Sequence, residues 1–291
     1  MAKLESFDRI TKLQEDLLEK GYCFNQIAAI SLYAKAADDL KTKSSIRQIP
    51  SDNHIPITIG SVYFSYSIPQ FLFKQEIFTS KFFKSFVEYT NPKYPNSTLQ
   101  FELDHNADSH SQKKSISIEQ ITEKHRTKFS ITDYPSLNIS TVAKHKNFGC
   151  GLELALGLRS LRFITYNAAL FWSNDRHRIG IKHISTDKKE YSLGNLVCSM
   201  YYDFKKDLKL GSSFIYTSEK TVEVKFGCQY RFSPDLIIKT RGDSEGALGI
   251  VLRNRINEYL TVVSASQFNV KSLSQNRSPK MDFSFKVKIN E

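Results

Sequence analysis

The second half of the chain alternates between apolar and polar side chains with a period of two residues. Between residues 221 and 232 the apolar positions are Val222, Val224, Phe226, Cys228, Tyr230 and Phe232, and the polar or small ones are Glu223, Lys225, Gly227, Gln229 and Arg231. Residues 281–290 repeat the pattern. Successive side chains of a β-strand point to opposite faces, so each of these strands separates an apolar from a polar environment. Both a soluble β-sandwich and a transmembrane β-barrel, with its segments of about 10 residues, show this pattern.

Composition narrows the choice between the two. The 291 residues are 40% hydrophobic, which is low for a soluble globular domain and suits a barrel wall that is wet on one face. No segment approaches the roughly 18 to 20 consecutive apolar residues of a transmembrane helix. The start, MAKLESFDRI, lacks the apolar core of a secretion signal and the Arg-rich, acid-poor character of a mitochondrial presequence, so we expect targeting information elsewhere. The net charge of +11 fits nucleic acid, an anionic membrane surface or an anion-conducting lumen.

The pattern predicts two parts, an N-terminal amphipathic helix with a hinge over residues 1–24 and an all-β barrel over residues 25–291. The helix is expected over 3–20, with Gly21 where helices commonly stop and thus as the hinge. The most polar segment, 104–126, is expected to hold an exposed loop. About nineteen strands are predicted, at 25–35, 40–47, 56–68, 71–78, 82–89, 98–105, 115–121, 128–131, 137–146, 148–158, 162–172, 178–184, 190–202, 208–217, 222–232, 236–241, 247–254, 259–268 and 281–289.

Motifs of covalent chemistry find no support in their context. Residues 242–246 match the G-x-S-x-G form of a hydrolase, but a strand follows, and the last histidine, His183, precedes the serine. His105 and His110 match no compact metal site, Gly246 and Gly249 lack the lysine of a phosphate-binding loop, and the four cysteines lie far apart. We therefore predict neither enzymatic activity nor a cofactor or metal.

Basic residues recur on the polar faces of the predicted strands. A closed barrel would line its lumen with them and favour anions, although the solvated faces of a soluble β protein would carry the same pattern. The residues in question include Arg178, Lys182, Lys225, Arg231, Lys286 and Lys288.

Three segments resemble the mitochondrial voltage-dependent anion channels, the eukaryotic porin family. Residues 19–24, Glu-Lys-Gly-Tyr-Cys-Phe, resemble the family's Lys-Gly-Tyr-x-Phe step, and the end of the chain resembles its membrane-insertion signal, with Lys280, Phe285 and Val287 at the matching positions. Between 230 and 252 the porin signature is matched by Tyr230, Pro234, Asp235, Thr240, Arg241, Asp243, Ser244, Gly249, Ile250 and Leu252, with departures at Ser233, Leu236 and Gly242. The family's nucleotide-linked Gly-Leu-Lys element is replaced by residues 97–99, Ser-Thr-Leu.

The resemblance implies a transmembrane barrel of about 19 strands in the mitochondrial outer membrane, with the helix inside the lumen. It implies diffusion of anionic metabolites past a basic lumen that also includes Lys12 and Lys20, and as partners the lipid bilayer, membrane proteins or other barrels, but no nucleic acid. Two alternatives share the fold: the barrel subunit of the mitochondrial protein-import translocase, and a structural barrel docked in a larger membrane complex.

Overall fold

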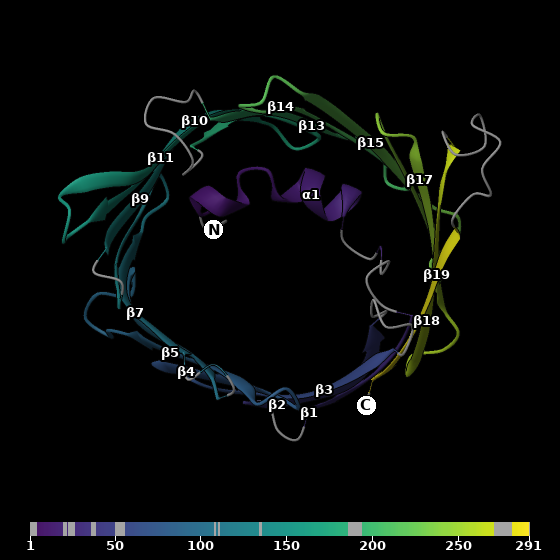
Figure 1. Cartoon of the computed structure of the whole chain (residues 1–291), viewed down its shortest axis with the longest axis horizontal. Coiled ribbons are helices and arrows are strands. Elements are labelled where there is room, and N and C mark those ends of the chain that lie inside the picture. The colour runs from purple at the N-terminus through teal and green to yellow at the C-terminus, as the bar shows by residue number, and fades with distance from the viewer. Residues whose placement is uncertain are drawn as a thin grey trace.

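The computed structural model shows a closed β-barrel with a short helical segment inside it (Figure 1). The structure describes residues 5–19, 22, 27–35, 39–49, 56–107, 109, 111–133, 136–185, 194–270 and 281–290. In this part of the chain no helix is both long and apolar enough to cross a membrane.

The described residues form one sheet of nineteen strands, the number that the sequence predicts. Neighbours along the chain pair antiparallel, and β1 and β19 pair in parallel to close the wall, with Ala29 opposite Lys286. The bounds are β1 (Ala28–Lys35), β2 (Leu40–Ile49), β3 (Ile57–Ile68), β4 (Phe71–Phe78), β5 (Phe82–Thr90), β6 (Ser97–Asn106), β7 (Ser111–Ile121), β8 (His125–Thr132), β9 (Ser136–His145), β10 (Phe148–Gly157), β11 (Arg162–Ser173), β12 (His177–Ile184), β13 (Asn195–Lys205), β14 (Leu208–Tyr216), β15 (Val222–Arg231), β16 (Leu236–Asp243), β17 (Ala247–Arg255), β18 (Leu260–Asn269) and β19 (Met281–Asn290).

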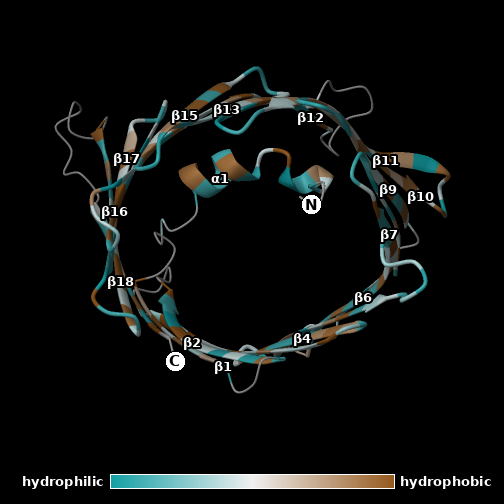
Figure 2. Cartoon of the chain, turned by 180° about the vertical axis from the view of Figure 1, so that it is seen from behind, coloured by the Kyte–Doolittle hydropathy of each residue, from teal (hydrophilic) through white to brown (hydrophobic). Residues whose placement is uncertain are grey.

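Each strand has one face toward the lumen and one toward the outside. In β15 a Cβ added at Gly227 would lie 2.8 Å from Leu18 of the internal helix, so Gly227 and the residues two positions away face the lumen. The alternate residues Phe226 and Tyr230 are 57% and 45% exposed on the outside. The strand pairings carry this assignment around the wall. Figure 2 shows the resulting alternation of hydrophobic and hydrophilic residues along the strands.

The outer face of the barrel is largely apolar. Large apolar side chains on it remain exposed on every side of the barrel, including Ile30, Phe101, Leu170 and Phe283. Monomeric soluble proteins rarely expose apolar patches larger than a few hundred Å². The wall is therefore that of a transmembrane barrel, in which lipid covers this face.

Less of the segment 104–126 is loop than the sequence predicts, because β7 begins before the predicted strand 115–121 and β8 before the predicted strand 128–131. β6 continues to Asn106, β7 spans Ser111–Ile121, and β8 begins at His125. The segment is polar because Ser115, Ser117 and Glu119 face the lumen, whereas Ile116 and Ile118 on the other face are 55% and 57% exposed.

The N-terminal helix is shorter and less regular than predicted. A 3₁₀ turn, η1 (Phe7–Arg9), precedes α1 (Lys12–Leu18), with Ile10 and Thr11 between them. The break lies where Phe7 and Ile10 pack on the wall, so contact with the barrel sets the local backbone at the expense of one continuous helix. Figure 1 shows both pieces inside the barrel. The expected hinge, Gly21, lies outside the described residues.

Candidate functional site in the barrel lumen

The first half of the helical segment docks through apolar contacts. Phe7 and Ile10 are 1% and 2% exposed and form one cluster with Val142, Ala169 and Phe171 on the lumen face of β9 and β11. Gly151 of β10 provides the space, since a Cβ there would lie 2.7 Å from the Phe7 ring. Burial of two large side chains stabilises this docking by a few kcal/mol.

The second half of the helical segment docks in the same way on β14 and β15. Leu17 lies over Gly211 of β14 and Leu18 over Gly227 of β15, and an added Cβ would lie 2.6 Å and 2.8 Å from the respective side chains. Both leucines are 3% exposed. Glycines on the lumen face thus form a shallow seat for the helix.

Polar contacts from β12 hold the start of the segment. The Arg178 guanidinium lies 2.8 Å from a carboxylate oxygen of Glu5, and the Gln14 amide donates to the Arg178 carbonyl at 3.5 Å. The Lys182 ammonium lies 4.7 Å from the centroid of the Phe7 ring, within cation–π range.

Basic residues of β15 and β16 hold the end of α1. Lys225 lies 3.8 Å from a Glu19 carboxylate oxygen and 3.0 Å from that of Glu223. The Lys239 ammonium donates to the Asp16 carbonyl at 3.2 Å, and the Arg241 guanidinium donates to the Leu18 carbonyl at 3.3 Å. The last carbonyls of a helix have no partners within it, and cations favour that end of the helix dipole.

Tyr22 continues the contact beyond the helix. It packs against Val251, Val263 and Ala265 of β17 and β18, and the Arg241 guanidinium lies 4.8 Å from its ring centroid. Burial raises the pKa of the Tyr22 phenol above its ordinary value, and the Arg241 charge acts in the opposite direction. Tyr22 thus remains neutral at physiological pH.

The charged residues of the lumen wall fall in two arcs that differ in charge, and β3, which lies between β2 and β4, carries none. The basic arc consists of the lumen faces of β11–β19, β1 and β2. Its acidic members are Asp203, Glu223, Asp243 and Asp282, and its more numerous basic members include Arg178, Lys182, Lys209, Lys225, Arg231, Lys239, Arg241, Arg253, Arg255, Lys286, Lys288, Lys41, Lys43 and Arg47.

The mixed arc, formed by β4–β10, balances its charges by pairing. Arg126 donates to Glu119 at 2.7 Å, and the Lys84 ammonium lies 3.6 Å from Asp104. Gln100 donates to Glu88 at 3.0 Å. Its acidic members are Glu76, Glu88, Glu102, Asp104, Glu119 and Glu153, and its basic members are Lys74, Lys84, Lys113, Arg126, Lys128 and Lys144.

The structure places the predicted site residues as follows. All six strand residues of the prediction take lumen-face positions: Arg178 and Lys182 on β12, Lys225 and Arg231 on β15, and Lys286 and Lys288 on β19. Lys12 is half-buried at the start of α1. Lys20, Gly21 and Lys280 lie outside the described residues. Phe285 and Val287, expected in the insertion signal, lie on the outer face of β19 beside β1.

Sequence reasoning missed several basic residues of the lumen. Five more basic residues lie on the lumen faces of their strands. They are Lys41, Lys43 and Arg47 of β2 and Arg253 and Arg255 of β17. The same alternation of apolar and polar residues could have identified them. In β2 the alternation is harder to recognise because Ser44 and Ser45 place a polar residue on both faces. Among the described residues no group of three or more His, Cys, Asp or Glu side chains is placed to hold a metal ion.

Comparison with known proteins places the barrel among porins. The sequence model described as "Eukaryotic porin" matches residues 5–280. A mutant of Rh. blastica porin has a similar structure, with a TM-score of 0.51 and 8% identity over 80% of this chain and 90% of that one. A structure titled "Asymmetric conductivity of engineered proteins" gives a TM-score of 0.48 and 9% identity over 87% of this chain and 94% of that one. At 8% identity the likeness to the Rh. blastica porin concerns the fold alone. No curated protein matches the sequence.

Proposed function

The chain belongs to the eukaryotic porin family, and we propose that it is a diffusion channel for anionic metabolites in the mitochondrial outer membrane. Family and fold together make it an outer-membrane β-barrel channel for small solutes, which carries out no covalent chemistry on them in this proposal. The preference for anions and the mitochondrial location go beyond what family and fold give, and they are the content of this proposal.

The basic arc is the observation that carries the anion preference. Lys41, Arg47, Arg253 and Arg255 are exposed on the lumen face, on strands outside the β13–β15 wall that α1 contacts. A lumen lined mainly by one sign of charge raises the local concentration of ions of the opposite sign. Phosphate- and carboxylate-bearing metabolites are the solutes that such a lumen would favour.

The helical segment supplies the constriction in this proposal. It occupies the lumen beside β9–β15 (Figure 2) and carries Glu5, Asp8, Glu15, Asp16 and Glu19 into a basic surrounding. With Gly21 as the hinge, residues 1–24 would move as a unit against the barrel of residues 25–291. A transmembrane potential acts on such charges by about 2.3 kcal/mol per elementary charge per 100 mV, so we expect the conductance to depend on voltage.

Planar bilayers test the anion preference directly. Purified barrel under a KCl gradient should give a reversal potential of the sign set by chloride, and raising the salt concentration should weaken the preference because the lumen charges are screened. A reversal potential of the opposite sign, or the absence of conductance from folded barrels, would refute the channel proposal. Location is tested separately, by fractionating cells that express the tagged chain.

A further inference from the structure

The outer wall has a notch over β8–β12 whose shape follows from the strand register. One row of outward residues crosses the five strands, with His125 opposite Ala143, Ala143 opposite Cys150, Cys150 opposite Leu170 and Leu170 opposite Ile181. The small residues Ala143 and Cys150 are thus adjacent between bulkier neighbours. The notch has a volume of about 620 Å³.

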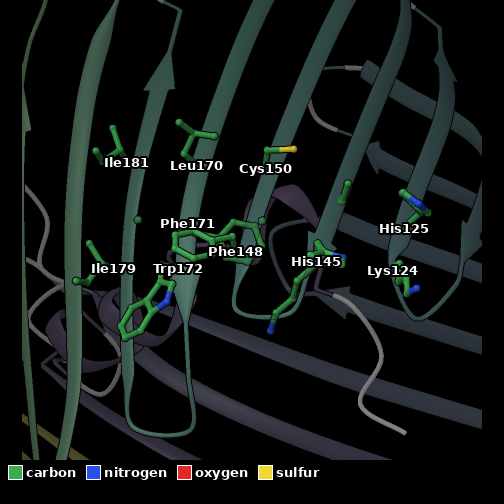
Figure 3. Close-up of a pocket in the computed structure, with 14 residues that line it drawn as sticks. Lys124, His125, His145, Phe148, Cys150, Leu170, Phe171, Trp172, Ile179 and Ile181 are labelled. Atoms are coloured by element: carbon green, nitrogen blue, oxygen red, sulfur yellow. The ribbon is translucent and has the colours of Figure 1, made fainter.

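The walls of the notch are apolar and lie at membrane depth. Phe148 and Trp172 face each other in the next row toward the strand ends, and Ile179 continues that row. Figure 3 shows Cys150, Leu170 and Ile181 in one row with Phe148, Trp172 and Ile179 next to it. An extended hydrocarbon chain fits such a groove without any polar partner.

The rim of the notch is basic. Lys124, His125 and His145 line it at the ends of β8 and β9 and are exposed (Figure 3). Among the described residues, none that lines the notch is acidic, and Glu123 of the same turn is not a lining residue.

Aromatic residues mark this rim as the level of the membrane interface. His177 stacks on Tyr202 with ring centroids 4.4 Å apart and lies 6.2 Å from Trp172. Trp and Tyr concentrate where lipid headgroups begin. The basic rim therefore lies at the depth of the phosphate groups, with the apolar notch below it.

We propose that the notch is a binding site for one anionic phospholipid. An acyl chain lies in the notch against Ala143 and Cys150, and the phosphate at the rim accepts hydrogen bonds from Lys124, His125 and His145. Charge complementarity selects an anionic lipid, because a lysine near the headgroup plane favours anionic over neutral lipid by about fivefold.

The position of Trp172 makes the site directly observable, because it is the single tryptophan of the chain and lines the notch. The full chain is reconstituted in bilayers that contain either brominated phosphatidylglycerol or brominated phosphatidylcholine, and bromine quenches the fluorescence of a neighbouring tryptophan. We expect the anionic lipid to quench Trp172 with about fivefold higher apparent affinity. Equal quenching by the two lipids would overturn the proposal.

Three variants separate a built site from diffuse attraction. The double variant Lys124→Gln/His145→Gln should abolish the preference, and so should Cys150→Phe, which fills the notch but keeps the basic rim. The matched control is Lys206→Gln, which removes a lysine from the β13–β14 turn at the same end of the barrel and should keep the preference. Loss of preference in this control, or its survival in Cys150→Phe, would overturn the site. An excess of inorganic phosphate should leave the preference for the anionic lipid unchanged. If phosphate instead makes the two lipids quench Trp172 equally, the rim binds a free anion and the proposed lipid site is wrong.

Discussion

The two arcs of the lumen wall use charged residues in different ways. In the mixed arc, acids and bases lie opposite one another on neighbouring strands, and Glu119 is only 4% exposed while it accepts from Arg126. In the basic arc, residues of like charge share neighbouring strands, as Lys286 of β19 and Arg47 of β2 do on either side of Ala29 of β1. The paired charges of the mixed arc stabilise the wall. The like-charged side chains of the basic arc repel one another, and in our interpretation their role is to attract the solute.

The helical segment lies across the boundary between these arcs. η1 contacts β9 and β10, and α1 contacts β13, β14 and β15. Its carboxylates Glu5 and Glu19 pair with Arg178 and Lys225 of the basic arc. The segment therefore places its paired carboxylates against β12 and β15, and in our proposal β17–β19, β1 and β2 form the part of the lumen that favours anions most strongly.

The largest effect is expected from breaking a pair in the mixed arc. Arg126→Met leaves the Glu119 carboxylate nearly buried with its closest cation removed, which should lower the free energy of unfolding by about 3 kcal/mol. Urea unfolding in lipid bilayers measures the loss. The double variant Arg126→Met/Glu119→Gln should recover most of it, because no uncompensated charge remains.

The matched control for this pair lies in the basic arc. Lys286→Met removes one of several like charges and should leave the stability unchanged or slightly raised. Equal losses in Arg126→Met and Lys286→Met would contradict the contrast between the arcs.

A smaller effect is expected at the boundary between the arcs. Phe7→Ala removes an aromatic side chain that is 1% exposed over Gly151 and should weaken the docking of the helix by about 2 kcal/mol. Faster hydrogen exchange in residues 7–18, with the strands unaffected, would report the change. Leu13→Ala is the control, because Leu13 is 39% exposed. If both variants exchange alike, the apolar seat does not hold the helix.

Charge reversal in the two arcs tests the anion preference itself. Arg253→Glu places an acid on an exposed stretch of the basic arc and should lower the ratio of anion to cation permeability about fivefold, the equivalent of ~1 kcal/mol for charges a few Å apart in water. Lys84→Glu makes the same change of charge beside Asp104 in the mixed arc and should lower the ratio less. Reversal potentials in a KCl gradient give both ratios, and a larger effect of Lys84→Glu would move the solute path to the other arc.

The fold and the sign of the lumen charge could be predicted because both depend on strand parity. Lys225 and Arg231 lie on the same face of any strand that contains them, and Phe226 and Tyr230 on the other, whatever the neighbours are. The number of strands and the family resemblance are confirmed for the same reason, since both depend on a pattern local to each segment.

Features that depend on which strands are neighbours could not be predicted. The docking of Phe7 depends on the space at Gly151, more than 130 residues away along the chain. The notch needs Ala143 opposite Cys150, a pairing set by the β9–β10 turn. The exposed loop expected within residues 104–126 is shorter than predicted, because β7 begins at Ser111 and polar residues such as Lys113 belong to the lumen face of the wall.

The smallest effect is expected where the helix meets the basic arc at an exposed pair. Glu19 and Lys225 are 3.8 Å apart, with the Glu19 side chain 60% exposed and Lys225 also beside Glu223 at 3.0 Å. An exposed pair of this kind contributes less than about 0.5 kcal/mol, so Glu19→Gln should not measurably alter helix docking in hydrogen exchange. It removes one acid from the lumen, however, so the anion preference should rise slightly in the same reversal-potential measurement. If the helix detaches in Glu19→Gln but stays docked in Phe7→Ala, charge and not apolar packing positions the segment. The two arcs would then differ in how they hold the helix as well as in the solute they favour.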